Sequence, residues 1–294
     1  MANKKRLTVI DAPSNLGLSP PTPYSEPGCY KMPWVLHNLG LLKLIGATYR
    51  GTVVPPRYSA HWEEGSGDRN AIEIANYSLR LSETVRDAIL QGEFPIVIGG
   101  DCSILIGNTL ALKSLGDFGL VFIDAHSDYR HPGNSKNIRA AAGEDLAIVT
   151  GKGDYRLLDI SGTGSSIKAK NVISLGILDS DENIAEMKQD GVSIFTNLDL
   201  INGKEIRPTL DKLEDRTDGF WVHLDFDVID RSEITAVDCP EETGVSFEIL
   251  LEVLRPVLSR SKCVGIEFTI YDPDLDPDFL QGKQIADFII RLLE

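Results

Sequence analysis

The sequence predicts an α/β fold of three layers, in which helices cover both faces of a mainly parallel β-sheet. Short apolar runs alternate with helical stretches along the 294 residues, at the spacing of βαβ units. Several of these runs are apolar throughout, as in strands buried on both faces. No flexible linker, low-complexity tract or internal repeat interrupts the pattern, so residues 1–294 are predicted to form a single domain.

The predicted elements follow from apolar spacing and from turn residues. Strands are expected where short apolar runs end in glycine, proline or polar residues: 7–13, 47–54, 94–101, 119–128, 171–177, 192–197, 219–230 and 262–272. Helices are expected where apolar residues recur at helical spacing: 33–45, 71–92, 103–116 and 285–294. Pro33 stands near the first helix start, and Gly92 suits a C-cap. The Gly/Pro/Ser-rich segment 14–28 is predicted to be a long loop near a site.

Composition narrows the possible partners. The formal net charge of −15 repels phosphate backbones and anionic membranes, so neither nucleic acid nor a membrane is an expected partner. The four cysteines lie far apart and form no CxxC pair, which disfavours a disulfide framework. The chain shows no signal peptide and no apolar run of the roughly 20 residues that a membrane span needs. We therefore expect a cytoplasmic protein.

Three polar clusters follow predicted strands at the points where these end. They are Gly-Gly-Asp-Cys-Ser (99–103), Asp-Ala-His-Ser-Asp (124–128) and His-Leu-Asp-Phe-Asp (223–227). In parallel sheets, ligands collect at the carboxyl ends of the strands. These three clusters are therefore expected to meet at one edge of the sheet.

The residue types in these clusters predict a metal centre. Residues i and i+2 of a strand point the same way, so Asp124 and His126 are expected to share a face, as are Asp225 and Asp227. Asp128 joins them if the chain changes direction at the strand end. Four clustered carboxylates repel one another unless cations neutralise them. Oxygen-rich ligation with one imidazole suits Mn²⁺, and bridging carboxylates suit two divalent ions, which lower the pKa of a shared water.

Each motif alone has a less specific interpretation. A DxH or DxD triplet occurs on solvated strand ends, and Gly-Gly-Asp is commonly a turn. All three, however, follow apolar strands, where charge is costly unless it serves a site. Cys102 adds a thiol to the set, although a buried thiol that binds nothing is the alternative. No GxSxG motif or convincing Ser/His/Asp arrangement offers a nucleophile of its own.

The motifs resemble the ureohydrolase family, which includes arginase, agmatinase and formiminoglutamase. The family pattern of GGDHS, DAHxD and DxD corresponds here to GGDCS (99–103), DAHSD (124–128) and DFD (225–227), followed by GIEFTIYDP (265–273). The similarity extends from about residue 7 to the C-terminus. It implies an arginase-like domain that hydrolyses a linear C–N bond in a small guanidino or amidino compound. Homo-oligomers are expected by the same analogy.

The resemblance also implies roles for single residues. One divalent ion, most plausibly Mn²⁺, would be held by Cys102, Asp124, Asp128 and Asp225. The other would be held by Asp124, His126, Asp225 and Asp227, so that Asp124 and Asp225 bridge the pair. Asp128 would be the catalytic residue, because it would orient the attacking oxygen and carry a proton to the leaving amine.

The sequence departs from the family pattern at three positions. Cys102 replaces the usual first ligand His, which makes this a divergent branch, and its softer thiolate favours Zn²⁺ more than His does. Ala142 stands where arginases and agmatinases carry a His, and nearby Asp145 is a candidate substitute acid or base. Ile270 replaces the acid that grips the guanidinium in arginase, and Glu267 lies close to it.

Arg130 and Asp181 are the candidates for recognition of the far end of the substrate. Arg130 follows the DAHSD cluster and suits a carboxylate, as in formiminoglutamase-like enzymes, although a surface ion pair is equally plausible. Asp181 aligns with a segment that contacts the substrate amino end in arginase. Candidate substrates are formimino compounds and Nω-hydroxyarginine, the latter because one branch of the family shares Cys at the first ligand position.

The sequence also allows comparison with two other classes of function. Loss of the usual residues at Cys102, Ala142 and Ile270 would also fit a non-catalytic or metal-poor arginase-like protein with a binding or structural role. A zinc deacetylase of the related histone-deacetylase-like fold is disfavoured, because the sequence has no His-His pair.

Overall fold

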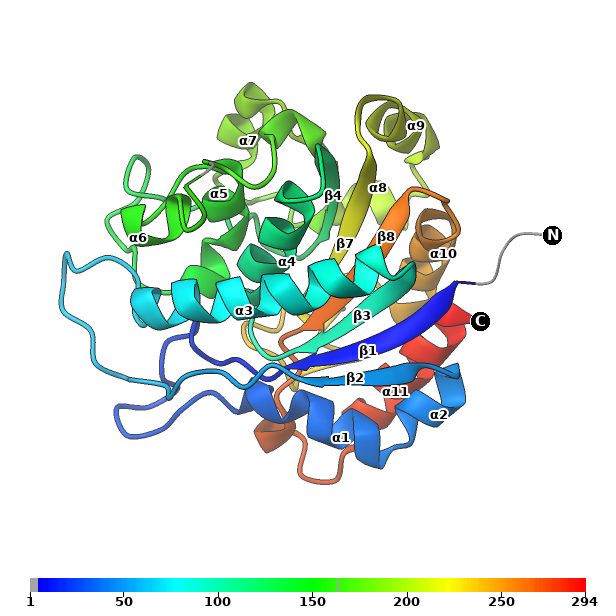
Figure 1. Cartoon of the computed structure of the whole chain (residues 1–294), viewed down its shortest axis with the longest axis horizontal. Helices are drawn as coiled ribbons and strands as arrows, with labels where there is room; N and C mark the ends of the chain where they lie inside the picture. Colours follow the sequence, from blue (N-terminus) through cyan, green and yellow to red (C-terminus); the bar gives the residue numbers. More distant parts are fainter. Residues whose placement is uncertain (1–4, 163) are drawn as a thin grey trace.

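A computed structural model describes residues 5–162 and 164–294. Its strands form one eight-stranded sheet of order β2-β1-β3-β8-β7-β4-β5-β6 (Figure 1). All neighbouring strands are parallel, which confirms the predicted fold class and makes the sheet parallel throughout. The strand bounds are β1 Arg6–Ala12, β2 Thr48–Thr52, β3 Glu93–Gly99, β4 Phe118–Ile123, β5 Val172–Ile177, β6 Ser193–Thr196, β7 Gly219–Asp225 and β8 Cys263–Thr269.

Helices cover both faces of this sheet, with α3 and α4 on one side and α1, α2 and α11 on the other (Figure 1). The α-helices are α1 Met32–Asn38, α2 Leu41–Ile45, α3 Ala71–Leu90, α4 Ile104–Lys113, α5 Asp145–Thr150, α6 Tyr155–Leu158, α7 Ile184–Asp190, α8 Asn197–Ile201, α9 Arg207–Arg216, α10 Phe247–Leu258 and α11 Leu280–Leu293. Each face has its own apolar core. Trp221 of β7 packs into the core beneath α3 and α4, whereas the next residue, Val222, packs into the opposite core. The strands are therefore apolar on both faces, as their sequences predict.

The predicted helix over residues 33–45 is wrong in one respect, because the structure contains two helices there. Gly40 has a φ of 82°, in the left-handed region, and this turns the chain between α1 and α2. The apolar spacing on either side of Gly40 continues across the break. Periodicity alone therefore did not reveal it.

The strand order brings the three polar clusters together. Strands β3, β8, β7 and β4 are consecutive neighbours at the centre of the sheet, and the clusters follow β3, β4 and β7. The Gly-Gly turn after β3 has to be narrow, since a Cβ on Gly100 would lie 1.7 Å from the main-chain oxygen of Ser14. On its other side, the Gly100 carbonyl accepts a hydrogen bond of 2.8 Å from the Ile270 amide.

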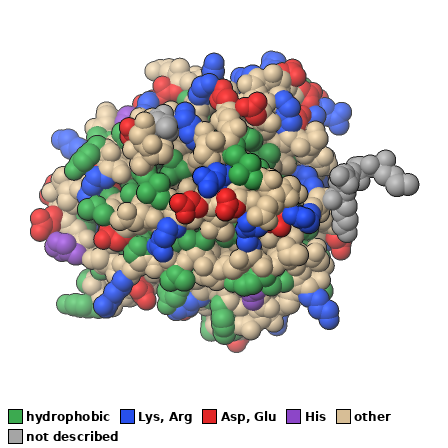
Figure 2. Space-filling view, in the orientation of Figure 1, with side chains coloured by type: hydrophobic (Ala, Val, Ile, Leu, Met, Phe, Trp, Pro, Cys, Tyr) green, Lys and Arg blue, Asp and Glu red, His purple; other side chains and the backbone are tan. Residues whose placement is uncertain are grey.

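The surface carries charges of both signs. On the face in Figure 2, Lys and Arg side chains are interspersed with Asp and Glu, without a continuous basic area. In the part of the chain that the structure describes, no helix has the length and apolarity needed to cross a membrane.

Two buried acids, Asp68 in the loop before α3 and Glu144 in the loop before α5, interact electrostatically. Asp68 is 2% exposed, and its amide donates to Asp154 Oδ2 at 2.8 Å. Burial and the neighbouring Glu144 raise the pKa of Asp68 to about 9. Asp68 is therefore protonated in the folded protein at neutral pH, whereas in the unfolded chain it is ionised.

We expect the Asp68→Asn variant to gain stability over the wild type as the pH rises. A raised folded-state pKa contributes stability that is fully present below the unfolded pKa and is lost as pH rises toward 9. The difference in unfolding free energy should grow by up to about 1.4 kcal/mol per pH unit. Urea unfolding between pH 6 and 9 measures it, with Asp87→Asn as a surface control. Parallel profiles for wild type and Asp68→Asn would contradict the assignment.

Candidate metal centre

Two groups of potential metal ligands meet at the carboxyl edge of the central strands. One consists of Cys102, Asp124, His223 and Asp225, and the other of Asp124, His126 and Asp227. Within each group the donor atoms lie within 4.8 Å of one another. Asp124 belongs to both groups. The structure thus brings five of the six predicted ligands together, adds His223, and places Asp128 outside both groups.

Turns rather than strand alternation orient these carboxylates. Strand β4 ends at Ile123, before Asp124, and Asp227 lies in a 3₁₀ turn, Phe226–Val228. The expectation that Asp124 and His126 share a strand face is therefore wrong. Instead, Asp124 Oδ1 accepts a hydrogen bond of 2.6 Å from the His126 amide. Asp225 Oδ1 accepts a similar bond of 2.7 Å from the Asp227 amide.

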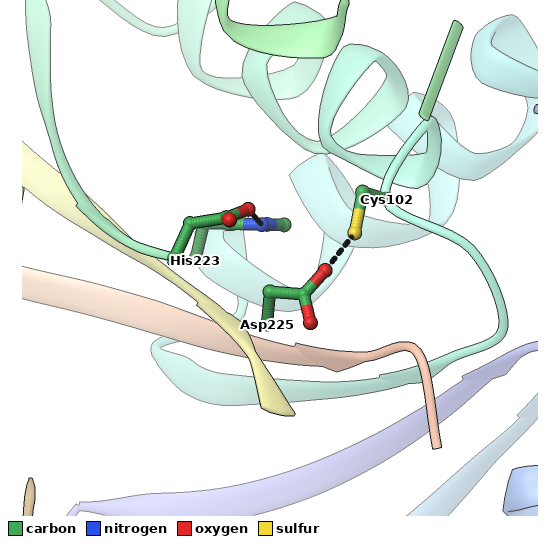
Figure 3. Close-up of side chains that lie close together, drawn as sticks. Cys102, His223 and Asp225 are labelled. Carbon is green, nitrogen blue, oxygen red and sulfur yellow. Dashed lines mark hydrogen bonds and ion pairs between the residues drawn. The ribbon is translucent and has the colours of Figure 1, made fainter. Parts of the chain in front are cut away.

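Cys102 lies in the turn after β3 and faces β7. Its Sγ donates to Asp225 Oδ2 at 2.6 Å and lies 3.2 Å from Thr269 Oγ1 (Figure 3). Burial and the adjacent Asp225 raise the pKa of the Cys102 thiol. Burial, followed by the charges of Asp227 and Asp124, raises the pKa of Asp225. A cation would stabilise both ionised forms, so this environment is one in which metal binding displaces a proton.

His126 bridges the second group to a loop carboxylate. Its Nδ1 lies 3.0 Å from Asp227 Oδ2, and its Nε2 lies 3.1 Å from Glu241 Oε1. Burial lowers the pKa of His126, but hydrogen bonds with Asp124 and Asp227 outweigh it and raise the pKa overall. Burial and Asp124 together raise the pKa of Asp227 to about 7. His126 Nδ1 is therefore directed at Asp124 and Asp227, whereas its Nε2 contacts Glu241.

Two buried polar atoms indicate that divalent cations fit these residues. Asp124 Oδ2 and His223 Nε2 lack a hydrogen-bond partner among the described residues, and they lie 4.0 Å apart. An acceptor without a partner in the interior is costly. A cation between the two atoms would remove that cost, and carboxylate, imidazole and thiolate are all established ligands of divalent metals.

A cavity of about 380 Å³ opens above the ligand groups. Its walls include the potential ligands Cys102, His126, Asp225 and Asp227, and also Asp128, Arg130, Arg139, Ala142, Asp181 and Ile270. Asp128 has a φ of 44°, and burial and Asp124 raise the pKa of its carboxyl. Arg130 reaches the Gly143 carbonyl at 3.4 Å. Asp181 Oδ2 accepts a hydrogen bond of 3.1 Å from the Ser127 amide.

Asp145 and Glu267 are predicted substrate-binding residues that do not line this cavity. Both are completely buried. Glu267 instead accepts hydrogen bonds from Asn108 and from His223, the latter at 2.7 Å. Burial, followed by the charge of Asp128, raises the pKa of Asp145. Neither carboxyl lines the cavity in this structure, so their direct contact with a substrate stays a prediction.

Sequence reasoning missed the contribution of the segment 230–245. Asp238 and Cys239 line the cavity, and Glu241 contacts His126. Cys239 has a φ of 53°, so this loop turns sharply toward the site. The segment follows the Asp225–Asp227 motif directly and carries several acids. That proximity is a usable signal, although it does not reveal which acid turns inward.

Comparison with known proteins agrees with the fold and the motifs. The model of the Arginase family matches residues 56–293. An arginase of Staphylococcus aureus (strain MRSA252) is 34% identical over 77% of this chain and 76% of its own length. The arginase of Bacillus caldovelox has a similar fold, with a TM-score of 0.87, 24% identity and 98% coverage of both chains. Formimidoylglutamase of Bacillus subtilis superposes with a TM-score of 0.75 at 20% identity, covering 100% of this chain and 88% of its own.

The fold and the clustered acids define an α/β protein with candidate metal ligands at the carboxyl edge of a parallel sheet. The family match and the similarity to the staphylococcal arginase identify it further: the chain belongs to the arginase family of hydrolases.

Proposed function

We propose that this protein hydrolyses a C–N bond in the guanidino or amidino group of a small molecule, with the help of two divalent ions. One observation carries the proposal: two groups of ligands share Asp124, and four of their other members, Cys102, His126, Asp225 and Asp227, line one cavity. Asp225 contacts both Cys102 and the Asp227 amide, which suits a second shared position. Mn²⁺ is the ion that the oxygen-rich second group fits best.

The ions would supply Lewis acidity at the reacting carbon and lower the pKa of water. The residues of this chain supply the remaining steps. Asp128 projects into the cavity beside Asp124, where its carboxyl takes a proton from the attacking water. Water oxygen adds to the planar carbon, the C–N bond breaks, and Asp128 returns the proton to the leaving nitrogen. The products are an amine and urea, or the corresponding amide.

Cavity charges point to a substrate with an amino-acid end. Arg130 and Arg139 line the wall, and no ion pair holds either guanidinium among the described residues. A carboxylate accepts two parallel hydrogen bonds from such a group. Asp181 lies in the same cavity and suits an ammonium group. Nω-hydroxyarginine and formimino derivatives of amino acids are the candidate substrates. Cytoplasmic location and homo-oligomers stay predictions.

Ile270 disfavours a simple arginine substrate. Its side chain lines the cavity where the family carries an acid, and its φ of 77° is unusual for a β-branched residue. An apolar side chain cannot pair with a charged guanidinium. A less basic group, such as an N-hydroxyguanidine or a formimino group, fits this wall better.

Metal content and turnover test the proposal together. Protein purified with added Mn²⁺ is assayed by mass spectrometry and by amine or urea release from Nω-hydroxyarginine, formiminoglutamate, arginine and agmatine. We expect about two divalent ions per chain, with turnover fastest for one of the first two compounds. Agmatine lacks a carboxylate and should react slowest. Substoichiometric metal and no turnover of any compound would favour the alternative, a non-catalytic arginase-like protein with a binding or structural role.

A further inference from the structure

His223 is fixed in place by two contacts in the protein interior. It precedes Asp225 by two residues on β7, so both side chains point to the same side of the strand (Figure 3). Its ring stacks on Phe122 with centroids 4.6 Å apart and an angle of 9° between the planes. Nδ1 lies 2.7 Å from Glu267 Oε1. The residue is completely buried and has no freedom to turn away.

The Glu267 contact decides which nitrogen of His223 is free to bind. Glu267 also accepts from Asn108, and a carboxylate that receives both donors assigns the proton of the imidazole to Nδ1. Nε2 then presents its lone pair toward the site. A carboxylate that orients a histidine in this way is typical of metal-ligating imidazoles.

The group that faces His223 Nε2 is also a hydrogen-bond acceptor. Asp124 Oδ2, 4.0 Å away, likewise has no hydrogen-bond partner among the described residues. A purely structural histidine would leave both atoms buried without a hydrogen-bond partner, which is unfavourable. With Cys102 Sγ and an Asp225 oxygen they complete a four-atom group within 4.8 Å. Thiolate, imidazole and carboxylate are the three side-chain classes that hold Zn²⁺ in proteins.

We propose that His223 is an inner ligand of the first ion, which is bound by Cys102, Asp124, His223 and Asp225. This sulfur, nitrogen and oxygen set selects a borderline-soft ion such as Zn²⁺ or Co²⁺ over Mn²⁺. The second group, with Asp124, His126 and Asp227, has no sulfur and retains its preference for Mn²⁺. The inference deepens the proposed function by giving the two ions different chemical identities.

The test compares His223→Gln with the wild type in zinc competition against a chromophoric chelator and in cobalt absorption spectra. The wild type should bind one Zn²⁺ at the first site and one Mn²⁺ at the second. His223→Gln should weaken Zn²⁺ binding at least about 100-fold and alter the Co²⁺ spectrum, because a ligand is lost. Mn²⁺ bound at the second site, followed by electron paramagnetic resonance, should change little.

Matched variants separate the outcomes. His37 forms a comparable pair with Asp11, at 2.9 Å, and its imidazole lies outside both ligand groups, so His37→Gln should leave zinc affinity unchanged. If His223→Gln does not fold, Glu267→Gln serves instead, with an expected 10- to 100-fold loss of Zn²⁺ affinity. Wild-type zinc affinity and an unchanged cobalt spectrum in folded His223→Gln would overturn the assignment of His223 alone. A wild-type protein that binds neither ion would overturn the proposed function with it.

Discussion

Replacing Asp225 and Asp227 together by asparagine is expected to abolish both metal binding and turnover. Asp225 contacts Cys102 in the first group, and Asp227 contacts His126 in the second. The double change therefore removes an anionic ligand from each group. Neutral amides bind divalent cations far less strongly than carboxylates do, and without the ions the reacting water keeps its high pKa. The loss of turnover should be at least on the order of 10³-fold.

The same variant should be more stable than the wild type when both are stripped of metal. Burial and the neighbouring charges raise the pKa of Asp225 and of Asp227, so both carboxylates destabilise the metal-free fold when ionised. Thermal unfolding with a chelator measures this, and Asp230→Asn, outside the ligand groups, is the control. Full activity in the double variant would refute the metal centre. If the double variant unfolds, the same measurements are made on Asp225→Asn and Asp227→Asn separately, and full activity in both would again refute the metal centre.

Cys102→His is expected to increase the affinity for Mn²⁺ at the first site by about tenfold or more. Burial and Asp225 raise the pKa of the Cys102 thiol, so ion binding at neutral pH must first remove its proton. A neutral imidazole requires no such step and is a harder ligand than a thiolate. Affinity for Mn²⁺ in the wild type should therefore rise more steeply with pH than in the variant. Calorimetry at pH 6.5, 7.5 and 8.5 measures both effects.

The larger imidazole also has to fit where Cys102 is 1% exposed. Overpacking of this kind typically costs about 1–3 kcal/mol, so a lower melting temperature without metal is expected. Cys263→Ser, a change at a buried thiol outside the ligand groups, controls for loss of a cysteine. If Mn²⁺ binds only the Cys102→His variant, and Zn²⁺ binds neither protein, the natural thiol has disabled the site and the non-catalytic interpretation gains support.

The strands were predictable because their residues are apolar on both faces. The runs that contain β3, β4 and β7 need no tertiary information, and their parallel arrangement follows from the helices between them. The break at Gly40 was not predictable, because glycine occurs within helices as well as between them. Its left-handed φ depends on how α2 packs, which the local sequence does not encode.

The ligand residues were predictable in kind, whereas their geometry was not. Strand alternation holds for His223 and Asp225, since both lie within β7. It failed for Asp124 and His126, because β4 ends before them and a turn sets their directions. Glu267 was expected at the substrate, yet it belongs to an inward-facing position of β8 and contacts His223. Sequence proximity to a motif does not distinguish the cavity from the layer behind it.

The position of β7 and β8 has a consequence for how the protein is made. These strands come last in the chain, but they lie between β3 and β4 in the sheet. A nascent chain that ends before residue 219 therefore has two half-sheets with open inner edges and an incomplete set of ligands. Exposed strand edges of this kind invite pairing with other chains. Ion capture must await the synthesis of β7 and Asp227, so metal supply cannot guide the assembly of the strands that are made before them.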